Sequence, residues 1–100
     1  MERYKLKIFS IAYNDLREIA EYLYLKSPEA SARYYDLIIE KIGTLINMPE
    51  RCALVRDPKL RLQGYRMLIV KNYTVFFIVN GETVEIRRVL YSKRQYSDIL

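Results

Sequence analysis

The clearest alternation of apolar and polar residues lies around Asn80-Gly81, which VFFIV precedes and TVEI follows. A two-residue hairpin loop favours Asn-Gly, because both of its central residues need positive φ. We therefore predict a hairpin with Asn80 and Gly81 as its loop, so that Phe77 faces Val84 and Val75 faces Ile86. Side chains alternate along a strand, and one face then carries the core residues Val75, Phe77, Val79, Val84 and Ile86. The opposite face is mixed and carries Thr74, Phe76, Ile78, Thr83, Glu85, Arg87 and Val89.

A further strand is predicted before this hairpin, over Tyr65 to Val70 (YRMLIV), with Lys71-Asn72 as the connecting turn. Three consecutive antiparallel strands form a meander. The strand from Tyr73 to Val79 is apolar at nearly every position, so we expect it at the centre of the sheet.

The first half of the chain changes from a strand pattern to helix patterns. Residues 4–9 alternate, and Tyr4, Leu6 and Ile8 are predicted to point inward. Ser10 follows as a predicted helix N-cap. A helix reaching about Leu25 is then indicated by one apolar stripe, made of Ala12, Leu16, Ile19, Ala20 and Leu23.

A second helix is predicted to begin at Ser27-Pro28-Glu29, with Ser as the cap and Pro at the first helical position. Met48-Pro49 should end this helix, because the residue before a proline disfavours helical backbone. Its stripe is predicted from Tyr35, Ile38, Ile42 and Leu45. A loop from Pro49 to about Leu62 then leads to the meander.

The order strand, helix, helix, strand, strand, strand predicts an α+β fold (β-α-α-β-β-β), formed as a single domain over residues 1–100. A helical hairpin should pack on one face of a small antiparallel sheet, after an N-terminal strand and before a short C-terminal tail. The chain has too few helices to cover the second face fully. We therefore expect a partner to bind that face, together with the basic loop and tail.

Composition adds limits on where the protein acts. The hydrophobic share is 51%, and no apolar run approaches the roughly 18 residues of a membrane span. Cys52 is the one cysteine, so an internal disulfide is impossible. The start of the chain has no apolar leader core. These features predict a cytoplasmic protein that does not bind membranes.

The charge is unevenly distributed along the chain. Residues 1–50 contain seven Lys/Arg and eight Asp/Glu, whereas residues 51–100 contain ten and four. The basic excess thus belongs to the sheet half and the tail. It favours an acidic partner, either nucleic acid or an acidic protein segment, over a merely soluble basic surface.

Several chemistries are excluded by residue type. With no His, a zinc site or a Ser-His or Cys-His pair has no support, and the three separate glycines form no phosphate loop. No metal or cofactor is predicted. A candidate basic and aromatic cluster remains: Arg61, Arg66, Arg87, Arg88, Lys93, Arg94, Tyr91 and Tyr96. Such residues could cleave RNA through the substrate's 2′-hydroxyl, although tyrosines also pack in strands and cations also serve only as solvated surface.

Three stretches together resemble the RelE/ParE superfamily of toxins from bacterial type II toxin–antitoxin modules. They are the amphipathic start around residues 12–19, the segment YRMLIVKNYTVFFIV, and the ending VEIRRVLYSKRQYSDIL. The resemblance spans nearly the whole chain. It implies a growth-arresting toxin that a cognate antitoxin holds inactive by wrapping it with a flexible segment.

The superfamily divides by target, and the resemblance bears on that division. RelE-like members cut messenger RNA in the ribosomal A site with strand cations and a tail tyrosine, whereas ParE-like members poison DNA gyrase and are not nucleases. When the cleavage residues of RelE-like members are placed on this sequence, two of their positions fall on Arg66 and Tyr96. The next expected Lys falls on Leu68 or Ile69, and the next Arg falls on Thr74.

Losing such charges typically costs ~10²–10³ each in rate. We therefore favour the gyrase-binding role. A ribosome-dependent endoribonuclease using Arg66, Arg87, Lys93, Arg94 and Tyr96 is the alternative, and a degenerate toxin that retains only antitoxin binding is a third.

Overall fold

The computed structural model describes residues 3–100; Met1 and Glu2, at the start that we examined for a leader, lie outside the described residues. The elements in order are β1 (Lys5–Ile8), α1 (Ser10–Lys26), α2 (Pro28–Gly43), η1 (Thr44–Ile46), η2 (Pro49–Arg51), α3 (Pro58–Leu62), β2 (Tyr65–Val70), β3 (Tyr73–Asn80) and β4 (Thr83–Tyr91). This order confirms the predicted α+β fold. It adds α3 and the 3₁₀ turn η2 where we predicted a loop, and the 3₁₀ turn η1 where we predicted the end of the second helix. None of the helices over these residues is long and apolar enough to span a membrane.

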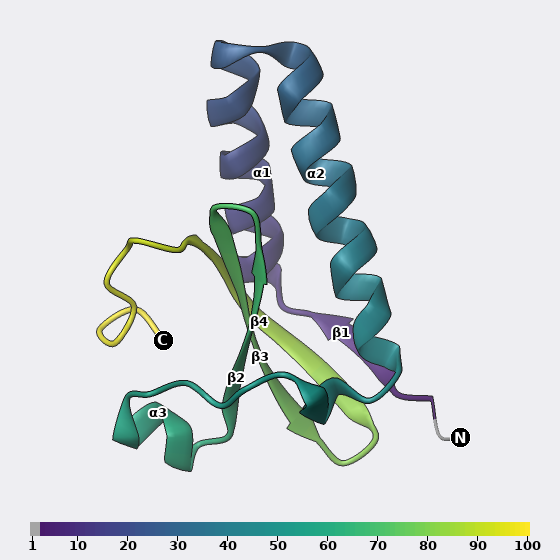
Figure 1. The fold of residues 1–100 in the computed structure, drawn as a ribbon, viewed down its shortest axis with the longest axis vertical. Helices are drawn as coiled ribbons and strands as arrows, with labels where there is room; N and C mark the ends of the chain where they lie inside the picture. The colour runs from purple at the N-terminus through teal and green to yellow at the C-terminus, as the bar shows by residue number, and fades with distance from the viewer. Residues whose placement is uncertain (1–2) are drawn as a thin grey trace.

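The four strands form one mixed sheet in the order β1-β4-β3-β2 (Figure 1). The meander is antiparallel as predicted, and β3 is an inner strand. β1 joins at the edge of the sheet and runs parallel to β4, with Lys5 opposite Thr83 and Ile8 opposite Ile86. Parallel neighbours need a long crossover, which here contains the helical hairpin and the first two meander strands.

The junction between the helices is fixed by small polar groups. Ser27 caps α2 as predicted, its Oγ accepting a hydrogen bond from the Ala30 N–H at 3.2 Å, and Pro28 occupies the first helical position. The Ser31 hydroxyl then donates to the carbonyl oxygen of Ala20 at 2.7 Å, which joins α2 to α1. The two helices therefore run back along each other and rise together from the sheet (Figure 1).

Three details of the helices differ from the prediction. Ser10 is the first residue of α1; Phe9 takes the cap position, and no side chain caps the helix there. α2 ends at Gly43, ahead of the predicted Met48-Pro49, because the chain tightens into the 3₁₀ turn η1. Tyr34 packs against the core in place of Tyr35, which is exposed.

The β3–β4 turn lies one residue later than predicted. Asn80 faces Thr83, so Gly81 and Glu82 form the loop, and Val79 faces Val84. Gly81 has φ +62° whereas Glu82 is not in the left-handed region, and a loop with Gly at its first position needs positive φ only there. The pairing moves by two residues, so the predicted division of side chains between the two faces is kept up to Ile86.

Beyond Ile86, β4 contains a bulge that the sequence pattern did not indicate. The pairing with β3 passes from Ile86 directly to Arg88 and leaves Arg87 as an extra residue. An extra residue moves the following side chains to the other face. Val89, which we predicted on the mixed face, therefore lies in the core and is 1% exposed.

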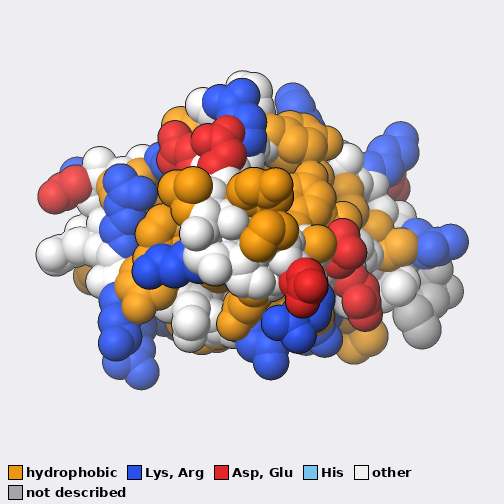
Figure 2. All heavy atoms as spheres, turned by 90° about the horizontal axis from the view of Figure 1, so that it is seen from above, with side chains coloured by type: hydrophobic (Ala, Val, Ile, Leu, Met, Phe, Trp, Pro, Cys, Tyr) orange, Lys and Arg blue, Asp and Glu red, His pale blue; other side chains and the backbone are white. Residues whose placement is uncertain are grey.

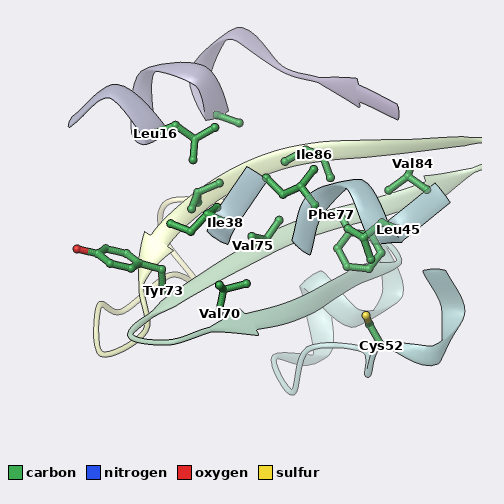
Figure 3. Close-up of a cluster of buried hydrophobic side chains, with 13 residues drawn as sticks. Leu16, Ile38, Leu45, Cys52, Val70, Tyr73, Val75, Phe77, Val84 and Ile86 are labelled. Atoms are coloured by element: carbon green, nitrogen blue, oxygen red, sulfur yellow. The ribbon is translucent and has the colours of Figure 1, made fainter. Parts of the chain in front are cut away.

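The main core lies between the helical hairpin and one face of the sheet (Figure 3). The predicted strand residues on this face are confirmed: Val75, Phe77, Val84 and Ile86 are fully buried, and Val79 packs against them. Helix residues close the core from the other side, namely Ala12, Leu16, Ile38, Ile42 and, from η1, Leu45.

The second face of the sheet is also partly covered. A smaller cluster forms there from Val55, Leu60, Tyr65, Phe76 and Leu90. The C-terminal residues Tyr96, Ile99 and Leu100 pack against it. The tail and α3 thus occupy much of the surface that we expected to be open.

Replacing Phe77 by Ala should destabilise the protein by about 3–5 kcal/mol, because the side chain is fully buried and its removal leaves a cavity. The matched control is Ile69→Ala on neighbouring β2, where the side chain is 63% exposed. Urea unfolding followed by circular dichroism measures both changes. Similar losses in the two variants would contradict the observed burial.

Candidate functional site

Arg66, the first predicted cleavage residue, is held by the backbone of the neighbouring segment. Its Nη1 donates to the carbonyl oxygens of Cys52 at 2.6 Å and Glu50 at 3.2 Å. Arg66 faces Phe77 across the ladder, so its side chain leaves the sheet on the side of the main core. Arg66 therefore fastens the segment before α3 to the first residues of β2.

Arg87, the bulge residue, lies on the opposite face of the sheet. Its Nη2 is 3.0 Å from Glu85 Oε1, and its guanidinium lies over the Phe9 ring at 4.7 Å from the centroid. Nη1 also donates to the Tyr65 hydroxyl at 3.4 Å. The charge is thus paired and the side chain is half-buried.

Arg88 forms the most enclosed ion pair described over residues 3–100. Its Nε donates to Asp15 Oδ2 at 2.7 Å and its Nη2 to Oδ1 at 2.8 Å. The same carboxylate accepts the Val89 N–H at 3.0 Å. These hydrogen bonds raise the pKa of Arg88 above its usual value. Arg88 is consequently a structural residue that joins β4 to α1, and Asp15, which we had not selected as a site residue, is its partner.

The remaining predicted cations are exposed on two separate segments. Arg61 is exposed on α3, and Lys93 and Arg94 are exposed just after β4. Tyr96 is half-buried and packs on Phe76 with a ring-centroid distance of 4.8 Å. The predicted cluster is therefore not brought together at one place.

The two cationic positions missing from the cleavage pattern fall on Leu68 or Ile69 and on Thr74. Leu68 packs against the main core. Thr74 is 5% exposed, and its hydroxyl shares a hydrogen bond of 2.8 Å with the Ser92 hydroxyl. Leu68 and Thr74 therefore take part in packing, whereas Ile69, the alternative to Leu68, is 63% exposed.

An open groove lies between α1 and the ends of β3 and β4, with a volume of about 710 Å³. Its lining includes Glu18, Tyr22 and Lys26 from α1, and Tyr73, Tyr91 and Arg94 from the sheet side. Of these, Arg94 and Tyr91 belonged to the predicted cluster. The sequence pattern gave no reason to join them to α1, because the groove depends on how α1 crosses the sheet.

Tyr73 is the buried centre of this aromatic lining. Its ring meets those of Tyr34 and Tyr91 edge-on, at centroid distances of 6.4 Å and 6.1 Å. Burial raises the pKa of the Tyr73 hydroxyl above its usual value, and the nearby hydroxyls of Tyr22, Tyr34 and Tyr91 raise it further. Phenol hydroxyls from two helices and two strands therefore converge at this end of the sheet.

Within residues 3–100, no group of three or more His, Cys, Asp or Glu side chains is placed to hold a metal ion. Cys52 is buried, and burial raises the pKa of its thiol. It is therefore poorly suited to act as a thiolate nucleophile.

Residues 10–96 match the family described as the ParE toxin of type II toxin–antitoxin systems, parDE. Among proteins with curated functions, none matches the sequence.

Two solved structures have similar folds. One is from a chromosomal ParDE toxin–antitoxin system of P. aeruginosa: it has a TM-score of 0.76 and 24% identity, and the match covers 91% of this chain and 98% of that one. The other is from the RelBE2 toxin–antitoxin complex of Mycobacterium tuberculosis, with a TM-score of 0.64, 22% identity, and coverage of 89% and 98%. At these identities the similarity concerns the fold.

Proposed function

We propose that this chain, which belongs to the ParE family of type II toxin–antitoxin toxins, arrests bacterial growth by binding DNA gyrase without catalysis of its own. The predicted resemblance to the RelE/ParE superfamily is confirmed by the family match. The choice of target is the proposal. It stands on the arrangement of the cations and on the surface that the fold leaves exposed.

The dispersal of the predicted cleavage residues carries this proposal. Arg66 is hydrogen-bonded to backbone carbonyls on one face of the sheet, Arg87 lies on the other face, and Lys93 and Arg94 are exposed after β4. Cleavage of a phosphodiester needs a base, an acid and cationic support aimed at one phosphate. Arg66 and Arg87 lie on opposite faces of the sheet, and this separation favours a binding protein over a ribonuclease.

The surface best suited to binding a protein partner is the helical hairpin. Among the described residues, six of the ten exposed large hydrophobic side chains belong to it: Ile11, Tyr13, Tyr22, Tyr24, Leu25 and Tyr35. Figure 2 views the molecule from the hairpin end and shows hydrophobic side chains together there, with charged ones around them. Exposed apolar groups of this kind, rimmed by charge, are typical of protein interfaces.

A cognate antitoxin is the second partner that we propose. Both similar structures come from toxin–antitoxin systems, and one is a toxin–antitoxin complex. An amphipathic antitoxin segment would lie either on the mixed sheet face, where we expected a partner, or on the hairpin. Because α3 and the tail already cover much of the mixed face, the hairpin is the better site. An antitoxin bound there would block access of the target to the same surface.

Induced expression of the chain in bacteria should stop growth and cause DNA breaks without cutting mRNA. Primer extension measures cuts in cellular mRNA, and an assay of chromosomal breaks measures damage to DNA. Co-expression of the antitoxin encoded beside the toxin gene should restore growth. In-frame cuts at the ribosomal A site would show the RelE-like endoribonuclease instead. Unaffected growth would indicate a degenerate toxin.

Changing Tyr24 and Leu25 together to Asp should weaken antitoxin binding by roughly 30-fold or more, because two apolar contacts are replaced by charge. These side chains are 61% and 87% exposed, so folding should be unaffected. The matched control is Leu62→Asp, at a side chain 90% exposed on α3. Calorimetric titration with the purified antitoxin measures each affinity. An equal effect of Leu62→Asp would place the interface on the sheet side.

A further inference from the structure

The groove beside α1 offers aromatic surface that the fold covers only in part. Tyr22 and Tyr91 line it and are 57% and 47% exposed, although both are large aromatic residues. Tyr73 lies between them with its ring buried and belongs to the main core. The two outer rings are therefore open to a flat ligand, and the inner hydroxyl can bond to it.

Charge in the groove is arranged along α1. Glu18 and Lys26 are eight residues apart on this helix, which places them about 12 Å from each other along its axis. The ammonium of Lys26 lies 5.4 Å from the centroid of the Tyr22 ring, so positive charge and aromatic surface are adjacent. Arg94 lines the groove from the sheet side. Asp15 adds no free charge, because Arg88 pairs with it.

We propose that this groove binds a nucleoside 5′-phosphate, either as a free nucleotide or as part of a single-stranded nucleic acid. The base lies against Tyr22 and Tyr91, since tyrosine rings stack on bases of any sequence. The phosphate is held by Lys26 and Arg94. Glu18, at the other end, accepts hydrogen bonds from amino groups on the base.

The size and chemistry of the groove favour this ligand over an acidic peptide. A volume of about 710 Å³ falls within the usual range of small-molecule sites, roughly 300–1,000 Å³. Carboxylates of a peptide would satisfy Lys26 and Arg94 but would leave the two open rings without a flat partner. The groove shares Tyr22 with the hairpin surface proposed for the antitoxin, but Tyr24 and Leu25, which test antitoxin binding, do not line it.

The test is fluorescence anisotropy of the purified full chain with two probes, AMP carrying a ribose label and a short labelled oligothymidine. We expect binding that weakens as salt rises, because phosphate contacts contribute. Changing Tyr22 and Tyr91 together to Leu should weaken it about tenfold or more. The control variant combines Tyr13→Leu with Tyr24→Leu. It removes two tyrosines that are 54% and 61% exposed and lie outside the groove, so its affinity for the two probes should be unchanged.

The two probes separate the possible sources of the ligand. Binding of the oligomer alone supports a nucleic-acid strand, and binding of labelled AMP supports a free nucleotide. The proposal is overturned if neither probe binds, if both double variants lose affinity equally, or if an acidic peptide fills the groove and the nucleotides do not. None of these binding measurements involves gyrase. The proposal of a nucleotide site and the proposal of gyrase as target can therefore be contradicted independently of each other.

Discussion

The ion pair between Asp15 and Arg88 is the contact on which the arrangement of this molecule depends. β1 pairs with β4 only as far as Ile86, so the edge of β4 beyond that point lacks a neighbouring strand. The Asp15 carboxylate closes this edge by accepting the Val89 N–H and both guanidinium donors of Arg88. A buried carboxylate is tolerated only when it is fully paired, which holds α1 in one position against the sheet.

That position decides which side chains remain available for partners. When Asp15 of α1 is bonded to β4, the apolar stripe of α1 faces the core. Tyr22 and Lys26 then lie beside the first residue of β3 and the last residue of β4. The hairpin then extends beyond the sheet and exposes its outer apolar side chains. Meanwhile Arg66, a predicted cleavage residue, and Arg88, another member of the predicted basic cluster, are engaged in structural contacts. The proposed function follows from this division: exposed aromatic surface for binding, and no assembled group of cations for cleavage in the described residues.

Local patterns in the sequence predicted the elements well, because their causes are local. Alternation defined the strands, and Ser27-Pro28 marked the start of α2 by chemistry that acts within one turn. The bulge at Arg87 could not be predicted from the pattern, because an extra residue is recognised only by the pairing with the neighbouring strand. Val89 was therefore assigned to the wrong face of the sheet. The pairing of Asp15 with Arg88 joins residues 73 positions apart, and a single carboxylate on a helix is usually solvated surface. Nearness in sequence likewise did not show that the fold would pair Arg87 with Glu85 and Arg88 with Asp15.

A double-mutant cycle on Asp15 and Arg88 tests the central claim most directly. Unfolding free energies would be measured for Asp15→Asn, Arg88→Gln and the double variant. We predict a coupling energy of about 2–3 kcal/mol, because the carboxylate and guanidinium side chains are only 7% and 15% exposed. Additive effects, with a coupling near zero, would contradict the claim that this pair holds the helical hairpin on the sheet.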